Sequence, residues 1–358
     1  MGSPLRQKDV SQCGDRRVPH GELIMMCSHS DYGKVADGFL SEEQRGEHLK
    51  ILIYGAGVIG SIFGVKLSRA GHDVTVLARG KRLAEIKDKG LVLRNPNTGS
   101  EEKAAVRTVE TLQPDMEFDY LFVVMQRTQI NAVLDSLARN RSKNIVFVVN
   151  TCAGYEEWIQ AVGMDRLMLG FPSAGGGRAD GVVDCFIGRG LMRMFQTTTF
   201  GEVRGNETQR VKTLIKAFNR AGIPSVYCSD MDAWQKTHVA MVTSIANALY
   251  GHGCDNKKLA GAFQDVKTMV QGIQEGFSVL RRLGVQPTPK KLCFFQLPVG
   301  LLMVVFGLFL RTRLAEFAMA RHCIAAKQEM VCLQKEFDAL IEQSGVSTPN
   351  IERLRKNL

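Results

Sequence analysis

The sequence predicts an α/β N-terminal domain with a mostly parallel sheet, followed by an all-α C-terminal domain. Between residues 49 and 229, short apolar runs alternate with helical patterns, as in strand–helix–strand units. From residue 230 onward the strand signals vanish, and helical periodicity continues almost to the C-terminus. A chain of 358 residues also has enough length for two cores. We therefore expect a tail at 1–48, an α/β domain at 49–229 and a helical domain at 230–358.

The individual elements follow from the period of the apolar residues. Buried strands read as short apolar runs, whereas amphipathic helices repeat their apolar residues every three or four positions. On this basis we expect strands at 49–54, 73–78, 119–125, 144–149 and 224–228, β-rich segments at 91–93 and 104–109, a turn at 95–99, and helices at 58–70, 207–221 and 232–251.

Charge and cysteine content argue against several classes of protein. The net charge is +10, but no run of five like charges occurs, so the basic residues suit small anionic ligands better than nucleic acid. The nine cysteines are odd in number, scattered, and form no C-x-x-C pair, which disfavours a disulfide framework or a zinc site. We therefore expect no nucleic-acid partner, no bound metal and a cytoplasmic location.

Two segments bear on targeting and on membranes. Residues 1–48 carry no secretory signal and are expected to form a mostly disordered tail. Residues 293–310 form an uncharged stretch, but Gln296 and Pro298 fall early in it, and the apolar run from 297 to 310 is only 14 residues long. That length favours a buried core helix over a membrane segment, so we expect no membrane partner.

A glycine-rich fingerprint, G-x-G-x-x-G, directly follows the first expected strand and opens a helix: Gly55-Ala56-Gly57-Val58-Ile59-Gly60. In such a loop Gly55 permits the tight turn, Gly57 lets the backbone approach a pyrophosphate, and Gly60 allows close packing of helix on strand. The helix N-terminus presents free N–H groups to the phosphates. This pattern predicts a dinucleotide-binding Rossmann domain; the alternative is a tight turn without a ligand.

The residue at the end of the second strand discriminates between the two nicotinamide cofactors. NAD enzymes usually carry Asp or Glu there to bind the ribose 2′-hydroxyl, whereas this chain has Arg79. A guanidinium binds a 2′-phosphate through charge-assisted hydrogen bonds, and a carboxylate would repel it. Arg79 therefore favours NADP(H), with a solvated basic turn as the alternative.

The strand–GAGVIGSIFG–helix–strand–ARG pattern, followed by a helical domain that opens with Trp234-Gln235-Lys236, resembles the ketopantoate reductase family. The resemblance covers about residues 49 to 350 and includes a late helix bearing Glu329. It implies a Rossmann domain and an all-helical C-terminal domain that together reduce the carbonyl of an α-keto acid with NADPH.

Carried over residue by residue, the resemblance makes Arg79 the 2′-phosphate ligand and puts Asn150 near the nicotinamide. It makes Lys236 the catalytic lysine and Glu329 a late acidic residue that contacts the substrate. For Glu329 the alternative is a solvated acid.

Several positions depart from the family pattern. Gln126 stands where a lysine is common, and Thr151 stands where a glycine follows Asn150. Ala240 and Ser244 replace two asparagines on the helix of Lys236. Because such residues shape the substrate pocket, we expect a bulkier or more apolar keto compound than ketopantoate to be preferred.

Hydride delivery to a carbonyl places negative charge on its oxygen, so a positioned acid is needed, and Lys236 is the best candidate. Asn247 lies eleven positions on, about three helical turns, and therefore shares the face of Lys236. Asn247 and Ser244 are the candidate substrate-binding residues. His238 lies on the other side of the helix and is expected to pack or to lie on the surface.

The loop at 173–178, Ser-Ala-Gly-Gly-Gly-Arg, could let the backbone approach a ligand, although three glycines more often mark a flexible turn. Arg178 and Arg127 are both candidates to bind a substrate carboxylate. The sequence does not choose between them.

We therefore expect an NADPH-dependent reductase of an α-keto acid or related carbonyl compound. Two alternatives remain open: another NADP-dependent hydroxyacid dehydrogenase with a lysine acid, and a degenerate NADPH-binding sensor or scaffold without turnover. The oligomeric state is open, with a homodimer as one candidate.

Overall fold

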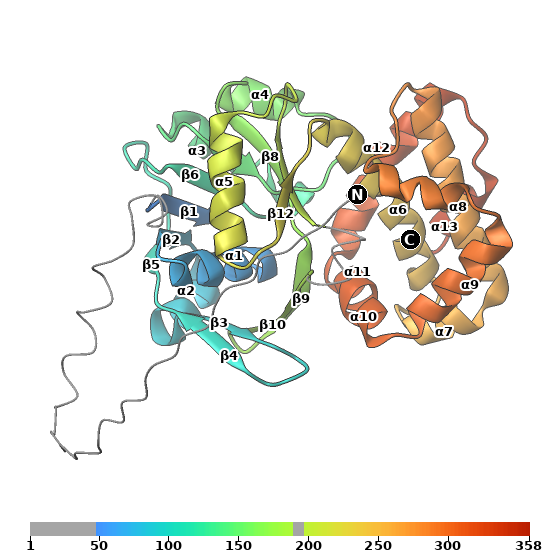
Figure 1. The fold of residues 1–358 in the computed structure, drawn as a ribbon, viewed down its shortest axis with the longest axis horizontal. Helices are drawn as coiled ribbons and strands as arrows, with labels where there is room; N and C mark the ends of the chain where they lie inside the picture. Colours follow the sequence, from blue (N-terminus) through green and yellow to red (C-terminus); the bar gives the residue numbers. More distant parts are fainter. Residues whose placement is uncertain (1–47, 189–196) are drawn as a thin grey trace, which may run out of the picture. The chain divides into compact units, whose positions relative to one another are not determined.

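The N-terminal part of the chain is built on an eight-stranded sheet of order β12-β11-β8-β7-β6-β1-β2-β5 in the computed structural model, which describes residues 48–188 and 197–358 (Figure 1). Its strands are β1 (Lys50–Tyr54), β2 (Asp73–Leu77), β5 (Arg107–Val109), β6 (Tyr120–Val123), β7 (Ile145–Phe147), β8 (Leu167–Phe171), β11 (Thr198–Glu202) and β12 (Ser225–Tyr227). All neighbours pair in parallel except β11 with β8. The predicted mostly parallel sheet is confirmed.

Helices cover both faces of this sheet. One face packs against α1 (Val58–Arg69) and α5 (Gln209–Arg220), the other against α3 (Leu134–Arg139) and α4 (Glu156–Val162). Side chains of a strand alternate between faces, and β1 is apolar on both: Ile51 and Ile53 belong to one core, Leu52 to the other. Burial on both faces is why this strand reads as a continuous apolar run.

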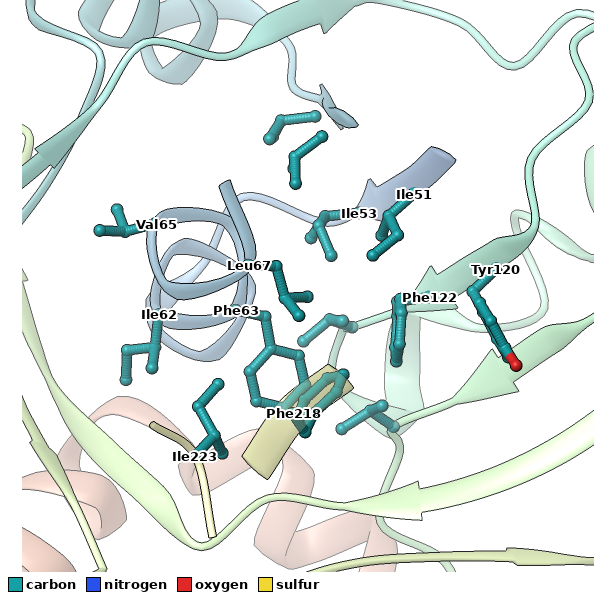
Figure 2. Packing of buried hydrophobic residues seen from close by; sticks show 14 of the residues in the cluster. Ile51, Ile53, Ile62, Phe63, Val65, Leu67, Tyr120, Phe122, Phe218 and Ile223 are labelled. Atoms are coloured by element: carbon teal, nitrogen blue, oxygen red, sulfur yellow. The ribbon is translucent and has the colours of Figure 1, made fainter. Parts of the chain in front are cut away.

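Four buried phenylalanines fix α1 and α5 on the sheet. The ring of Phe218 on α5 lies 4.9 Å from Phe63 of α1, 5.5 Å from Phe122 of β6 and 4.8 Å from Phe200 of β11, centre to centre. Figure 2 shows Phe63 and Phe218 meeting between the helices and the strands. Edge-to-face contacts of this kind add to the hydrophobic gain from burial. They hold the first turn of α1 at the carboxyl ends of the strands.

A second sheet, of order β4-β3-β10-β9, was not expected from the sequence. It consists of β3 (Leu91–Arg94), β4 (Glu101–Ala104), β9 (Ala174–Ala179) and β10 (Val182–Ile187), and α2 (Gly80–Lys89) precedes it. The flexible turn predicted from the glycines is wrong, because they lie in β9, paired antiparallel with β10. A Cβ atom at Gly176 would lie 1.9 Å from the carbonyl oxygen of Asp184, so pairing requires glycine there.

The C-terminal region is helical, as predicted. It contains α6 (Met231–Tyr250), α7 (Asn256–Gly261), α8 (Phe263–Arg282), η4 (Lys290–Gln296), α9 (Val299–Leu310), α10 (Arg313–Ala315), a π-helical turn η5 (Glu316–Ala320), α11 (Arg321–Ala325), α12 (Lys327–Ser344) and α13 (Pro349–Arg355). Its core consists of residues from Val239 onward together with Cys152. The described residues group into one compact unit. The tail expected at 1–48 lies, apart from His48, outside the described residues.

Helices α6 and α8 approach closely because small residues face each other. A Cβ atom at Gly276 would lie 3.1 Å from that of Ala240, and one at Gly272 would lie 3.1 Å from the Ser244 hydroxyl. Side chains larger than Ala240 and Ser244 would push the two helices apart. Both positions are therefore under a packing constraint that the sequence did not reveal.

The apolar segment 293–310 forms η4 and α9. In the described ranges, no single helix is long and apolar enough to cross a bilayer, and this pair meets the length and composition criterion only with a bend of 114°. The predicted core helix is correct for one side of α9, where Leu302, Phe306 and Leu310 are buried. The other side is exposed, with Leu308 at 62%.

Candidate functional site

The three fingerprint glycines differ in what a side chain at each position would contact. Gly55 has a φ of +119°, and a Cβ there would lie 2.1 Å from the carbonyl oxygen of Val124 on the neighbouring chain segment. A Cβ at Gly60 would lie 1.9 Å from the carbonyl oxygen of Gly55. A Cβ at Gly57 would meet nothing within 4 Å. Packing therefore requires Gly55 and Gly60, whereas the space above Gly57 is open to a ligand.

The fingerprint loop is held in place by Arg82 of α2. Its buried guanidinium donates to the carbonyl oxygens of Ala56 and Gly181 and to the Ser61 hydroxyl, and forms an ion pair with Glu85. Burial lowers the pKa of Arg82 from its usual value, although Glu85 opposes this effect. Arg82 therefore fixes the loop between β1 and α1, where Val58 and Ile59 form the first turn.

Arg79 lies just beyond the end of β2, on the surface. Its Nε donates to the carbonyl oxygen of Glu110 at 3.1 Å, and its Nη2 donates to the Tyr54 hydroxyl at 3.3 Å. Because Tyr54 is the last residue of β1, this contact holds the guanidinium beside the fingerprint loop. An exposed positive group is thus fixed where the ribose of a bound dinucleotide lies in Rossmann domains.

Asn150 follows β7, at the same edge of the sheet. Its side-chain oxygen is buried and has no hydrogen-bond partner among the described residues. Such an acceptor is costly unless a ligand or water satisfies it. The preceding carbonyl oxygen, of Val149, accepts a hydrogen bond from Gln235, whose own side-chain oxygen accepts from Tyr155. The start of α6 is therefore tied to the peptide next to Asn150.

Lys236 follows Gln235 on α6. Its Nζ lies 2.5 Å from a carboxylate oxygen of Asp232, one turn earlier, and its side chain is 18% exposed. Burial raises the pKa of the Cys152 thiol, the Glu336 carboxylate raises it further, and the positive charge of Lys236 opposes both. Lys236 thus lies close to the loop that follows Asn150.

Glu329 on α12 reaches the loop after β6. Its Oε1 accepts a hydrogen bond from the backbone N–H of Arg127 at 3.2 Å. Burial raises the pKa of Glu329 to about 7, and the charge of Glu336 acts in the same direction, whereas the Arg127 N–H opposes them. This carboxyl group is therefore protonated in part of the molecules near neutral pH.

Glu336, which sequence reasoning missed, joins two loops at the edge of the sheet. One carboxylate oxygen accepts from Arg127 Nε at 2.8 Å; the other accepts from the Thr151 hydroxyl at 2.8 Å and from the Cys152 N–H at 2.9 Å. The sequence spacing could have identified Glu336, because it lies seven residues after Glu329 and therefore on the same face of a helix. Arg127, a candidate for binding a substrate carboxylate, is already paired.

The two candidate substrate-binding residues lie inside the helical core. Ser244 is 2% exposed and packs against Gly272 of α8. Asn247 is 1% exposed; its amide donates to Gln334 on α12 at 2.8 Å, while its side-chain oxygen has no partner in the described part of the chain. Eleven residues separate Asn247 from Lys236, which is about 16 Å along a helix axis.

His238 packs, as expected. Its ring stacks on Trp234 at 5.6 Å between ring centres and lies 4.4 Å from Phe171. Enclosure by these neighbours lowers the pKa of His238 to about 3, and His322 acts in the same direction. The imidazole is therefore neutral at physiological pH.

Much of the chain is similar in sequence to known proteins. Residues 51–203 match the sequence model of the ketopantoate reductase PanE/ApbA family. The 2-dehydropantoate 2-reductase of Pyrococcus horikoshii is 26% identical over 248 residues, which is 66% of this chain and 75% of that protein.

Solved structures show the same fold. The crystal structure of 2-dehydropantoate 2-reductase from Geobacter metallireducens covers 86% of this chain and 98% of its own, with a TM-score of 0.70 and 17% identity. A ternary structure of D-mandelate dehydrogenase with NADH and anilino(oxo)acetate covers 86% of this chain and 96% of its own, with a TM-score of 0.68 and 17% identity.

The raised pKa of Glu329 predicts a pH-dependent stability. An unfolded glutamate ionises near pH 4.5, so raising its pKa in the folded state lowers the free energy of unfolding progressively between about pH 4.5 and 7. Glu329→Gln removes this loss, and we expect the variant to be more stable than the unmodified protein at pH 8, by on the order of 1–3 kcal/mol, but not at pH 4.5. Urea denaturation at both pH values measures the difference.

Glu342→Gln is the matched control, because Glu342 is an exposed glutamate on the same helix. It should leave the pH dependence unchanged. Equal effects of the two substitutions would show that Glu329 is an ordinary solvated carboxylate.

Proposed function

The protein belongs to the ketopantoate reductase PanE/ApbA family, and from this membership we propose that it reduces an α-keto acid or a related carbonyl compound with NADPH. The observation that carries the proposal is the convergence of three features at one edge of the sheet. These are the open space above Gly57, the side-chain oxygen of Asn150, which has no partner among the residues that the structure describes, and Lys236 on a helix tied to the neighbouring peptide.

The residues present fit a nicotinamide dinucleotide. The first-turn N–H groups of α1 would bind the pyrophosphate, and Gly57 offers no side chain to block its approach. Arg79 would bind the 2′-phosphate, and Asn150 would accept a hydrogen bond from the nicotinamide end. Bound there, NADPH supplies the hydride.

Lys236 is the proposed general acid. Reduction of a carbonyl develops negative charge on the oxygen, and the ammonium group donates the proton that neutralises it. Asp232 restrains the position of the lysine through their ion pair. The amine left after transfer recovers its proton from water.

Glu329 is proposed to contact the substrate. A carboxyl group that is partly protonated near neutral pH can donate a hydrogen bond to a carboxylate or hydroxyl of the substrate. Because Arg127 is paired with Glu336, the exposed Arg178 on β9 is the better candidate of the two arginines for the substrate carboxylate. Ser244 and Asn247, buried among helices, would shape the pocket through α8 and α12.

The direct test is oxidation of NADPH in the presence of a panel of α-keto acids, from ketopantoate to larger and more apolar compounds. We expect turnover with at least one of them, with a higher kcat/KM for a compound bulkier than ketopantoate. A much higher kcat/KM for ketopantoate would contradict the expectation that the altered pocket prefers a bulkier substrate. Tight NADPH binding without turnover on any compound would support a sensor or scaffold instead.

Arg79 predicts the cofactor preference. A hydrogen bond to a charged group contributes about 1.5–3 kcal/mol, so NADPH should bind at least about tenfold more tightly than NADH. Arg79→Ala should remove most of this preference, and Arg79→Lys should retain part of it because the charge remains. Titration of both cofactors by fluorescence measures the affinities. Equal affinities in the unmodified protein would refute this role and favour an NAD-dependent hydroxyacid dehydrogenase.

Lys236→Ala tests the acid. We expect kcat to fall by about 10²–10⁴, with NADPH affinity nearly unchanged, because the lost group acts on the transition state. Asp232→Asn, which keeps the lysine but removes its ionic partner, should reduce kcat less. Loss of NADPH binding in Lys236→Ala, with little change in kcat, would make Lys236 a cofactor-binding residue.

A further inference from the structure

One side of α9 carries a continuous row of apolar side chains in contact with water. The exposed members are spaced three and four residues apart, so they share one helical face. They are Leu301 (50% exposed), Val304 (59%), Val305 (48%) and Leu308 (62%); Leu297 (42%), which precedes the helix, is exposed as well. We call these five residues the α9 stripe. A contiguous apolar row of this kind on a helix is typical of a docking surface.

The opposite side of α9 explains why the helix stays in place. Leu302, Phe306 and Leu310 pack into the core of the helical region, and Asn256 of α7 donates a hydrogen bond to the carbonyl oxygen of Leu310 at 2.7 Å. The stripe is therefore presented on a fixed helix, and its exposure is a property of the folded protein.

The charged residues of the chain segment that contains the stripe are all basic. Residues 276–315 contain no aspartate or glutamate. They contain six basic residues, two of which precede η4, two of which open it, and two of which follow α9: Arg281, Arg282, Lys290, Lys291, Arg311 and Arg313. Lys290, Arg311 and Arg313 are exposed at the two ends of the η4–α9 segment. A partner surface that binds the stripe must therefore be apolar in its middle and negatively charged at its ends.

We propose that the α9 stripe docks on an anionic lipid surface. The helix would lie parallel to the membrane, with the stripe among the upper acyl chains and the basic residues among the headgroups, as interfacial helices do. The 12 residues of α9 are about 18 Å long, too short for a hydrocarbon core of about 30 Å, so the contact is peripheral.

Charge favours lipid over a second copy of the chain. A symmetric dimer through the stripe would place the basic residues of one copy near those of the other, and like charges oppose such a contact. An anionic bilayer, by contrast, neutralises them. The residues proposed for reduction lie on α6, α12 and β9 and in the loops after β1, β2 and β7, and none of them belongs to the stripe.

Vesicle flotation of the full chain tests the proposal. We expect the protein to float with phosphatidylcholine vesicles that contain phosphatidylserine, to float far less with phosphatidylcholine alone, and to be released as salt increases. Leu301→Gln combined with Leu308→Gln should weaken binding by at least about tenfold, since two half-exposed leucines lose their apolar contact. Val226→Gln, at an exposed apolar residue on β12, is the control and should bind normally.

A second pair of variants tests the charges. Arg311→Gln combined with Arg313→Gln should weaken binding on the order of tenfold, at about 1 kcal/mol per charge near the surface. The control, Lys143→Gln combined with Lys216→Gln, removes the same net charge from exposed positions of the α/β region. Circular dichroism establishes that each variant is folded.

Three results would overturn the proposal. One is absence of flotation with the phosphatidylserine vesicles. Another is equal weakening by the two charge pairs, which would mean that net charge alone attracts the protein. The last is a dimer, measured by light scattering, that Leu301→Gln with Leu308→Gln dissociates; the stripe would then be an interface between copies.

Discussion

The buried carboxylate of Glu336 is the contact on which the candidate site depends. It accepts three hydrogen bonds, from the Arg127 guanidinium and from the Thr151–Cys152 segment, and so joins α12 to the loops after two neighbouring strands. Its side chain is only 10% exposed, so the hydrogen bonds are what make burial of its charge tolerable. Asn150 precedes one of these loops and Glu329 contacts the other. Asn150 and Glu329, the residues proposed to contact the cofactor and the substrate, therefore both depend on this one carboxylate for their positions.

The same proximity explains why Glu329 and Glu336 behave differently. Glu336 is surrounded by donors, whereas Glu329 accepts from one backbone N–H, is buried, and faces the charge of its neighbour. Two carboxyl groups on one helical face thus have different environments. Such a separation between a structural carboxylate and an easily protonated carboxyl group is common at sites that handle protons.

Local patterns were sufficient to predict the main sheet, the fingerprint turn and the change to helices. Each depends on residues close together in the chain, such as the run before Gly55 or the apolar period after residue 230. Contacts between distant segments were not accessible in this way. The pairing of β3 with β10, the hydrogen bond from Arg82 to Gly181, and the Glu336 contacts join residues about 90 to 210 positions apart. The packing of Ala240 on Gly276 likewise appears only when α6 and α8 are brought together.

Helix α6 belongs to both hydrophobic cores and connects them. It is 20 residues and about 30 Å long; its first turns, with Met231 and Trp234, belong to the core beneath the sheet, and its later turns belong to the helical core. Near one end of the helix Gln235 donates a hydrogen bond to Val149, and near the other end Asn247 donates one to Gln334. A helix held at both ends in this way resists sliding along its axis. Because Glu336 also fixes α12 to the loops after β6 and β7, Lys236 and Glu329 lie on two helices that are anchored separately to the same edge of the sheet.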